Sequence, residues 1–251
     1  MKKLLLILLC FPMIGFGQNV NIPDVNFKAY LVGEPLINTN GDTEIQLTEA
    51  TAFNGGIHCY QMSILDLTGI ENFTALTYLE CSYNQLTNIN ISQNIYLKGL
   101  FCNDNSLSSI DISQNDSLND LIAHNNLLSS IDLSNHNFFI NLYLNGNNLS
   151  SLDISHIDCG EILEPVFGSN PNLNCIEVND INCWESNYSW GIDTISQFFS
   201  TNCSTSLIKE QTTNKELLKT IDILGRETKQ TNQPLFYIYD DGTVEKRIVI
   251  E

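Results

Sequence analysis

The central part of the chain repeats one pattern of apolar and polar positions every 21 residues. Its four clear copies begin at Leu76, Leu97, Leu118 and Phe139. Three apolar columns keep the same offset in each copy: Leu79, Leu100, Leu121 and Leu142; Leu86, Leu107, Leu128 and Leu149; and Ile89, Ile110, Ile131 and Leu152. A fixed period without a slip predicts a solenoid, because one copy alone cannot bury its apolar edge and must stack on the next.

Weaker copies extend the pattern on both sides. The upstream copy has its apolar residues at Ile57, Cys59, Ile64 and Leu67. The downstream copy follows a short insertion and has them at Val166, Gly168, Leu173, Ile176 and Val178. The predicted repeat domain therefore covers 57–178, about six coils. In each coil the LxL segment predicts a short strand with alternate side chains pointing inward. The pattern resembles the leucine-rich repeat, LxxLxLxxNxL, which implies an α/β solenoid.

Two further columns inside the repeats carry asparagine or cysteine. Asn84, Asn105, Asn126 and Asn147 lie where the chain turns away from each strand, and Cys59, Cys81 and Cys102 lie at the second inward strand position. We expect the amides to form an internal ladder that satisfies unpaired backbone groups; a functional asparagine row is the alternative. The stacked thiols favour small apolar fillers over a metal site, because metal ligands converge from several directions.

Residues 18–56 are expected to cap the solenoid, with one helix around 26–32 and another after Leu47. The polar segment between them resembles an EF-hand calcium loop, with ligand-type residues at Asn38, Asn40, Asp42, Glu44, Gln46 and Glu49. Asn38 replaces the first aspartate, and Thr43 replaces the glycine of the sharp turn. A polar turn within a helical cap is the alternative. No cofactor is required by the sequence, and calcium is the one ion it suggests.

A second group of cysteines marks the other end of the solenoid. Cys159, Cys175, Cys183 and Cys203 lie in or near a predicted C-terminal cap over 179–203. In an exported protein such cysteines staple a small cap, and Cys175 with Cys203 is the first candidate pair. Spacing alone does not fix the connectivity.

Outward strand positions give the candidate binding face, because the sheet of such a solenoid lines its concave side. Phe101, Ile122 and Tyr143 form an apolar file at positions that face water, and Tyr83, Asn103 and His124 flank it. We expect this patch to contact a ligand. The alternative is that these residues only pack within the sheet.

The N-terminal residues 1–17 have the form of a secretory signal peptide. Two lysines precede an apolar run over 4–14 and small residues at 15 and 17. The run is too short to span a bilayer, and no other stretch is apolar enough, so the mature chain should have no transmembrane segment. Lipidation at Cys10 is the alternative, although Leu8 and Leu9 lack the small size of a lipobox.

The net charge of the chain limits the classes of partner that it can bind. The sequence carries 29 acidic against 11 basic residues, a net charge of −18. Such a surface repels nucleic acid and anionic membranes. Motifs of hydrolases and nucleotide-binding enzymes, such as HExxH, GxSxG or a glycine-rich phosphate loop, are absent from the sequence, so we expect no enzyme.

The last part of the chain follows a different rhythm. After a polar linker at 204–214, residues 215–251 alternate apolar and polar positions in three strand-like runs separated by turns. The segments TIDILGRET and FYIYDDGTVEKRIVIE, at the C-terminus, resemble the type A C-terminal sorting domain of the bacterial type IX secretion system. The residues that carry this resemblance are Asp222, Gly225, Arg226, Asp241 and Gly242.

Segments such as NIPDVNFKAYLVG and DLTGIENFTALTYLECSYNQLT extend the resemblance to secreted leucine-rich-repeat cargo of such bacteria. The resemblance implies recognition by the type IX translocon and a place at the cell surface or in the medium. The expected function is a non-enzymatic binding or adhesion protein that presents its concave face to a protein or glycan. A structural envelope or matrix component without a specific ligand is the alternative.

Overall fold

A computed structural model of the chain describes residues 17–193, 196–203, 217–221, 226–227, 234–239 and 244–248. The chain divides into two units, Met1–Ser204 and Thr205–Glu251. Residues 1–16 of the predicted signal peptide and the 204–214 linker lie outside the described residues. The same holds for four residues of the predicted sorting signal: Asp222, Gly225, Asp241 and Gly242.

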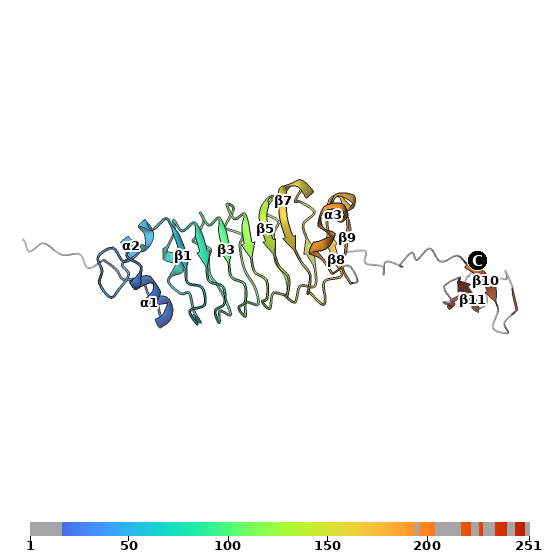
Figure 1. Ribbon diagram of the computed structural model, residues 1–251, viewed down its shortest axis with the longest axis horizontal. Helices are drawn as coiled ribbons and strands as arrows, with labels where there is room; N and C mark the ends of the chain where they lie inside the picture. Colours follow the sequence, from blue (N-terminus) through green and yellow to red (C-terminus); the bar gives the residue numbers. More distant parts are fainter. Residues whose placement is uncertain are drawn as a thin grey trace, which may run out of the picture. The chain divides into compact units, whose positions relative to one another are not determined.

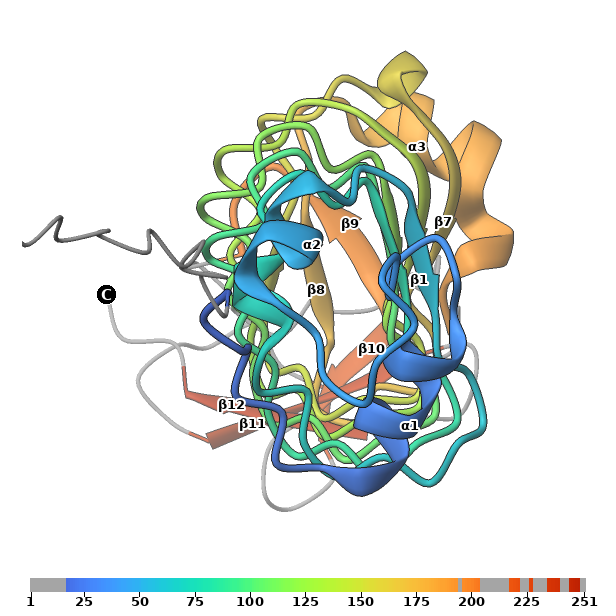
Figure 2. The same ribbon diagram turned by 90° about the vertical axis from the view of Figure 1, so that its left-hand side faces the viewer.

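The first unit is the solenoid that the 21-residue period predicts. Each coil contributes one short strand to a parallel six-stranded sheet (Figure 1), in the order β1 (Gly56–His58), β2 (Tyr78–Glu80), β3 (Gly99–Phe101), β4 (Asp120–Ile122), β5 (Phe139–Tyr143) and β7 (Ile162–Val166). Leu79, Leu100, Leu121 and Leu142 stand opposite one another in register and are fully buried. Viewed from the N-terminal side, the coils lie one behind another (Figure 2).

A second parallel sheet forms over the last coils, from β6 (Leu152–Asp153), β8 (Cys175–Glu177) and β9 (Phe198–Ser200). Its register pairs Leu152 with Ile176 and Ile176 with Phe199, all three buried. The apolar column that begins at Ile89 is less buried than expected, since Ile89 and Ile131 are only half-buried. The residues two places later are the deeper ones: Ile91, Ile112, Leu133 and Ile154, each 2% exposed or less.

The last coil differs from the predicted register by one residue. Val166 pairs with Tyr143, and Pro165 pairs with Leu142, so Pro165 and Phe167 point inward where Val166 and Gly168 were expected. The 3-10 helix η2 (Cys159–Glu161) precedes β7. One extra residue lies after β7: the offset between equivalent residues is 23 from Leu142 to Pro165 but 24 from Leu152 to Ile176. Sequence comparison by fixed offset misses such an insertion.

The N-terminal end is capped by the two expected helices, which lie in front of the coils in Figure 2. Helix α1 (Val25–Gly33) buries Phe27 and Leu31. It begins at Asp24, whose Oδ1 accepts from the backbone N–H groups of Asn26 and Phe27 at 2.9 Å. The other oxygen, Oδ2, accepts from Leu65 N at 2.8 Å, so one carboxylate ties the cap to the first coil. Helix α2 is Leu47–Ala52, and the 3-10 helix η1 (Ile70–Asn72) follows β1.

The C-terminal cap consists of α3 (Ile181–Tyr188), the 3-10 helix η3 (Ser189–Gly191) and β9, with Trp184 fully buried. Two disulfides fasten it. Cys175 is bonded to Cys203, the pair that the sequence suggested, and Cys159 is bonded to Cys183. The second bond joins α3 to η2, a pair that cysteine spacing alone does not determine.

The second unit is a three-stranded antiparallel sheet in the order β10 (Leu217–Ile221), β11 (Pro234–Tyr239) and β12 (Val244–Ile248). These strands coincide with the three strand-like runs of the sequence. Arg226 is exposed beside the isolated bridge between Ile221 and Glu227. Within the described residues, no helix combines the length and apolarity needed to cross a bilayer.

Candidate binding face on the solenoid

The outward positions of the six-stranded sheet form one surface, which we call the sheet face. Its central column is His58, Glu80, Phe101, Ile122, Tyr143 and Val166. Phe101, Ile122 and Tyr143 are direct cross-strand neighbours and each is partly exposed. The structure therefore brings the predicted apolar file together.

Tyr78 extends this file, although the sequence analysis did not select it. A Cβ atom built on Gly99 would come within 2.6 Å of Tyr78 Cδ1 and 2.9 Å of Phe101 Cε2. The two aromatic rings thus cover Gly99, and a larger residue there would displace them. The available signal was the glycine itself, since the next two coils carry Asp120 and Asn141 at that position.

A second aromatic group lies where the strands end. Tyr60 and Tyr83 are about half exposed, and their rings meet edge to face with centroids 5.8 Å apart. Tyr83 has a φ of 55°, and the equivalent residues Gln61, Asp104, Asn125, Gly146 and Ser169 are also left-handed. At this shared turn, every residue except Gly146 presents its side chain at the edge of the sheet face.

Asp104 is the polar centre of this edge. Its Oδ1 accepts from Asn125 Nδ2 at 2.9 Å and its Oδ2 from Asn103 Nδ2 at 2.8 Å, while His124 Nδ1 lies 3.8 Å from Oδ2. Burial alone would raise the pKa of Asp104, but these hydrogen bonds and His124 lower it below its usual value. The nearby carboxylate raises the pKa of Tyr83.

Two of the predicted face residues, Asn103 and His124, contact Asp104. Asn103 is only 8% exposed, and its Oδ1 accepts from Ser82 Oγ at 2.7 Å. Its side chain is therefore engaged between neighbours and offers a ligand little surface. His124 is half-buried beside the same carboxylate. The residue missing from the prediction is Asp104 itself.

Carboxylates also stand along the rest of the sheet face. Glu80 lies 3.4 Å from His58, Asp120 accepts from Asn141 Nδ2 at 2.6 Å, and Glu164 accepts from the Tyr143 hydroxyl. The outward positions of these strands and of the residues that follow them contain no lysine or arginine. The sheet face is thus aromatic and negatively charged.

The predicted calcium residues form hydrogen bonds within the N-terminal cap. Asn38 is buried and donates to Val32 O and Asp42 O, while Glu49 Oε1 accepts from Thr39 N at 2.8 Å. The other predicted residues are also engaged: Glu44 pairs with Lys28 at 2.6 Å, and Asn40 donates to Asp42. Among the described residues, no three His, Cys, Asp or Glu side chains are grouped as a metal site. Calcium binding stays a prediction.

The asparagine ladder expected from the sequence is confirmed. Asn126 Nδ2 donates to Cys102 O at 3.0 Å and Ala123 O at 3.2 Å, and its Oδ1 accepts from Leu107 N at 2.9 Å. The same set of bonds recurs at Asn84, Asn105, Asn147 and, in the last coil, Asn170.

The cysteine column, Cys59, Cys81 and Cys102, consists of fully buried free thiols. Burial raises the pKa of Cys59 and Cys102 to about 12, and that of Cys81 well above its usual value. These thiols stay protonated at neutral pH and fill the core, as the sequence analysis expected.

A second ladder, which the sequence analysis missed, follows the opposite turn. Asn94 Nδ2 donates to Ile70 O and Phe73 O, Asn115 Nδ2 to Ile91 O and Asn94 O, and His136 Nε2 bonds Asn115 O at 3.1 Å. His156 Nε2 continues it toward Leu133 O. His136 and His156 are therefore structural residues of this turn.

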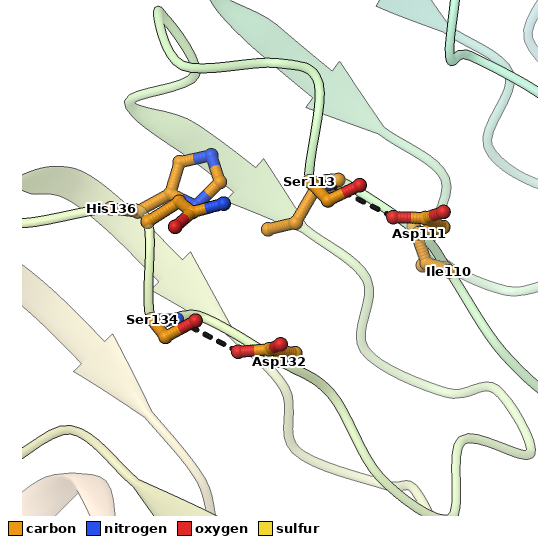
Figure 3. A pocket seen from close by; sticks show the side chains of 8 residues that line it. Ile110, Asp111, Ser113, Asp132, Ser134 and His136 are labelled. Atoms are coloured by element: carbon orange, nitrogen blue, oxygen red, sulfur yellow. Dashed lines mark hydrogen bonds between the residues drawn. The ribbon is translucent and has the colours of Figure 1, made fainter.

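Small cavities lie near this turn. One, of about 50 Å³, is lined by residues of two successive coils, among them His136 (Figure 3). Dashed lines there mark the bonds from Ser113 N to Asp111 and from Ser134 N to Asp132. A second cavity, near η1, has about 90 Å³. Small-molecule sites are typically several times larger, so the open sheet face is the better candidate for recognition.

Known proteins similar to this chain were found by sequence and by structure. No family model matches the chain. Internalin J of Listeria monocytogenes serotype 4b (strain F2365) is 37% identical over 83 residues, which are 32% of this chain and 9% of internalin J. The chain thus matches a small part of that relative's length.

Solved structures show the same likeness. The functional domain of InlJ from Listeria monocytogenes, which includes a cysteine ladder, superposes with a TM-score of 0.53 at 27% identity, over 64% of this chain and 38% of that chain. Internalin C2 from Listeria monocytogenes str. 4b F2365 superposes with a TM-score of 0.50 at 16% identity, over 67% of this chain and 83% of that chain, a likeness of fold alone. The repeat region is therefore a leucine-rich-repeat solenoid similar to those of Listeria internalins.

Proposed function

We propose that this chain is an exported, non-enzymatic binding protein that recognises a protein or glycan through the sheet face. The observation that carries the proposal is one patch: Phe101, Ile122 and Tyr143 are partly exposed cross-strand neighbours, and Tyr78 lies beside Phe101 over Gly99. Aromatic side chains that remain exposed in one patch are typical of recognition surfaces. Internalins are non-enzymatic leucine-rich-repeat proteins of the bacterial surface, typically used in binding or adhesion, which supports this proposal.

Binding is tested by a triple variant, Phe101→Ala, Ile122→Ala and Tyr143→Ala, applied to a glycan array and an array of extracellular proteins. Its matched control replaces one aromatic and two aliphatic residues that are exposed elsewhere: Tyr96, Ile95 and Leu127. We expect the face variant to lose ligands that the control retains, with both melting temperatures near that of the wild type. Equal capture by the two variants would refute the proposal.

We further propose that the C-terminal unit directs the chain to the cell surface or medium through the type IX translocon. Its support is the resemblance of residues 215–251 to type A sorting domains, together with three strands that form a sheet of their own. Mass spectrometry of medium, cell surface and periplasm should find the wild type outside and a chain truncated after Cys203 in the periplasm. The same distribution for both would exclude a sorting role.

The alternative, a structural matrix component, predicts self-association. Sedimentation of the purified chain over a wide concentration range distinguishes it from the binding protein. Reversible growth of large assemblies, together with no saturable capture on either array, would favour the matrix role.

A further inference from the structure

We infer that the sheet face binds a cationic protein segment, with lysine or arginine side chains at its two charged edges. This inference rests on the proposed binding function and names the chemistry of the partner. Four carboxylates, Glu80, Asp104, Asp120 and Glu164, lie on the same surface as the aromatic file. No lysine or arginine occupies an outward position of these strands or of the residues that follow them; the nearest cationic groups are His58 beside Glu80, His124 beside Asp104, and the exposed Lys98 that precedes β3.

One edge is suited to a guanidinium or ammonium group. Tyr83 lies half-exposed beside Asp104, and its ring meets that of Tyr60 edge to face. Hydrogen bonds with Asn103 and Asn125 hold Asp104 in place. A carboxylate beside aromatic faces offers an ion pair and a cation–π contact to one cation. The hydrogen bonds that lower the pKa of Asp104 keep it charged through the neutral and mildly acidic range.

The second edge lies at the other end of the file. Glu164 is exposed on β7 and accepts from the Tyr143 hydroxyl, and Asp120 stands two strands away on β4. From Asp104 to Glu164 the face extends over three strand spacings and five residues along the strand, roughly 20 Å. An extended segment covers that span with about six residues. The expected partner therefore carries two basic side chains about six residues apart, with an apolar residue between them over Ile122.

A neutral glycan fits the face less well. Sugar rings stack on aromatic side chains, but they provide no countercharge for the carboxylates that they cover, and burying an unpaired charge is costly. An acidic glycan would be repelled by the same groups. Glycans are therefore the competing outcome of the test.

The test uses the full chain and two probe collections: a displayed library of random peptides of about twelve residues, which exceeds the predicted span, and a glycan array. The charge variant combines Asp104→Asn and Glu164→Gln. Asparagine tolerates the left-handed backbone of residue 104, where φ is 54°, so the variant should fold. Its control, Asp116→Asn with Glu185→Gln, removes two exposed carboxylates away from the sheet face.

We expect the selected peptides to be enriched in paired lysine or arginine residues. Their affinity should fall about tenfold or more in the charge variant and at high salt, and should be unchanged in the control. Enrichment of neutral or acidic peptides would overturn the inference. Glycan ligands whose capture depends on the apolar file, and not on Asp104 and Glu164, would also overturn the inference. The proposed function would stand in that case. If neither collection yields a ligand that depends on the sheet face, both the inference and the proposed function fail.

Discussion

Removing one rung of the asparagine ladder tests how the solenoid is held together. Asn147 is 3% exposed; its Nδ2 donates to Ala123 O at 3.0 Å and Leu144 O at 2.9 Å, and its Oδ1 accepts from Leu128 N at 3.0 Å. At about 1 kcal/mol for each hydrogen bond, Asn147→Ala loses about 3 kcal/mol. Backbone groups left unpaired in the core raise the loss toward 5 kcal/mol.

The next residue provides the control. Asn148 is exposed, and its backbone N–H donates to Leu128 O, a bond that alanine keeps. Asn148→Ala makes the same chemical change one position away and should alter the free energy of unfolding by less than about 0.5 kcal/mol.

Urea unfolding measures both variants, with two probes because neighbouring coils can open separately. Far-UV circular dichroism follows the whole solenoid, and tryptophan fluorescence follows the C-terminal cap, which contains the buried Trp184 and the exposed Trp190. If the two variants unfold within about 0.5 kcal/mol of each other, the ladder does not carry the stability that its geometry indicates.

Three further outcomes follow from other parts of the fold. The cysteine column should resist iodoacetamide in the native protein and react fully in denaturant, as counted by mass spectrometry. Folding raises the pKa of these thiols to about 12 at Cys59 and Cys102. Their protonated form therefore adds fully to the free energy of unfolding below about pH 8.5, and this contribution is lost as the pH rises toward about 12. Replacing Cys175 and Cys203 by serine should cost about 2–4 kcal/mol, and Trp184 fluorescence should report it first. Burial raises the pKa of Asp24, but four backbone N–H donors lower it overall. Asp24→Ala should therefore lower the free energy of unfolding by about 1–2 kcal/mol near neutral pH. In acid titrations of stability, the difference from wild type should vanish as the pH falls below about 4.

The repeat columns were predictable because the same local geometry recurs in every coil. A residue type that keeps its place over four periods, as at Asn126, reveals its role before any contact is known. The second ladder was missed because its residue type changes: Asn115 and His136 make equivalent bonds to a carbonyl, yet they share no letter. The same hydrogen bond to the preceding coil is kept along the stack, although the residue that forms it changes from asparagine to histidine.

The sheet face was harder to predict for a different reason. Strand alternation identified the outward columns, but it did not show that the rings of Tyr78 and Phe101 close over Gly99. It also ranked Asn103 with the exposed groups, although its bonds to Ser82 and Asp104 hold it in the surface. At the left-handed turn, contacts with neighbouring coils set the direction of each side chain. The sequence of a single coil does not reveal those contacts.

Stability and recognition are separated in this architecture, and that separation makes the experiments check one another. From β3 to β5 the central outward column changes from Phe101 to Ile122 to Tyr143, while the asparagine bonds beneath it stay the same. Inward ladders fix the backbone, so outward side chains are free to vary without loss of fold. Variants of the sheet face should therefore change ligand capture at constant stability, whereas Asn147→Ala should lower stability and keep capture under native conditions. A face variant that unfolds the chain, or a ladder variant that loses only its ligand, would show that the two sets of side chains are coupled.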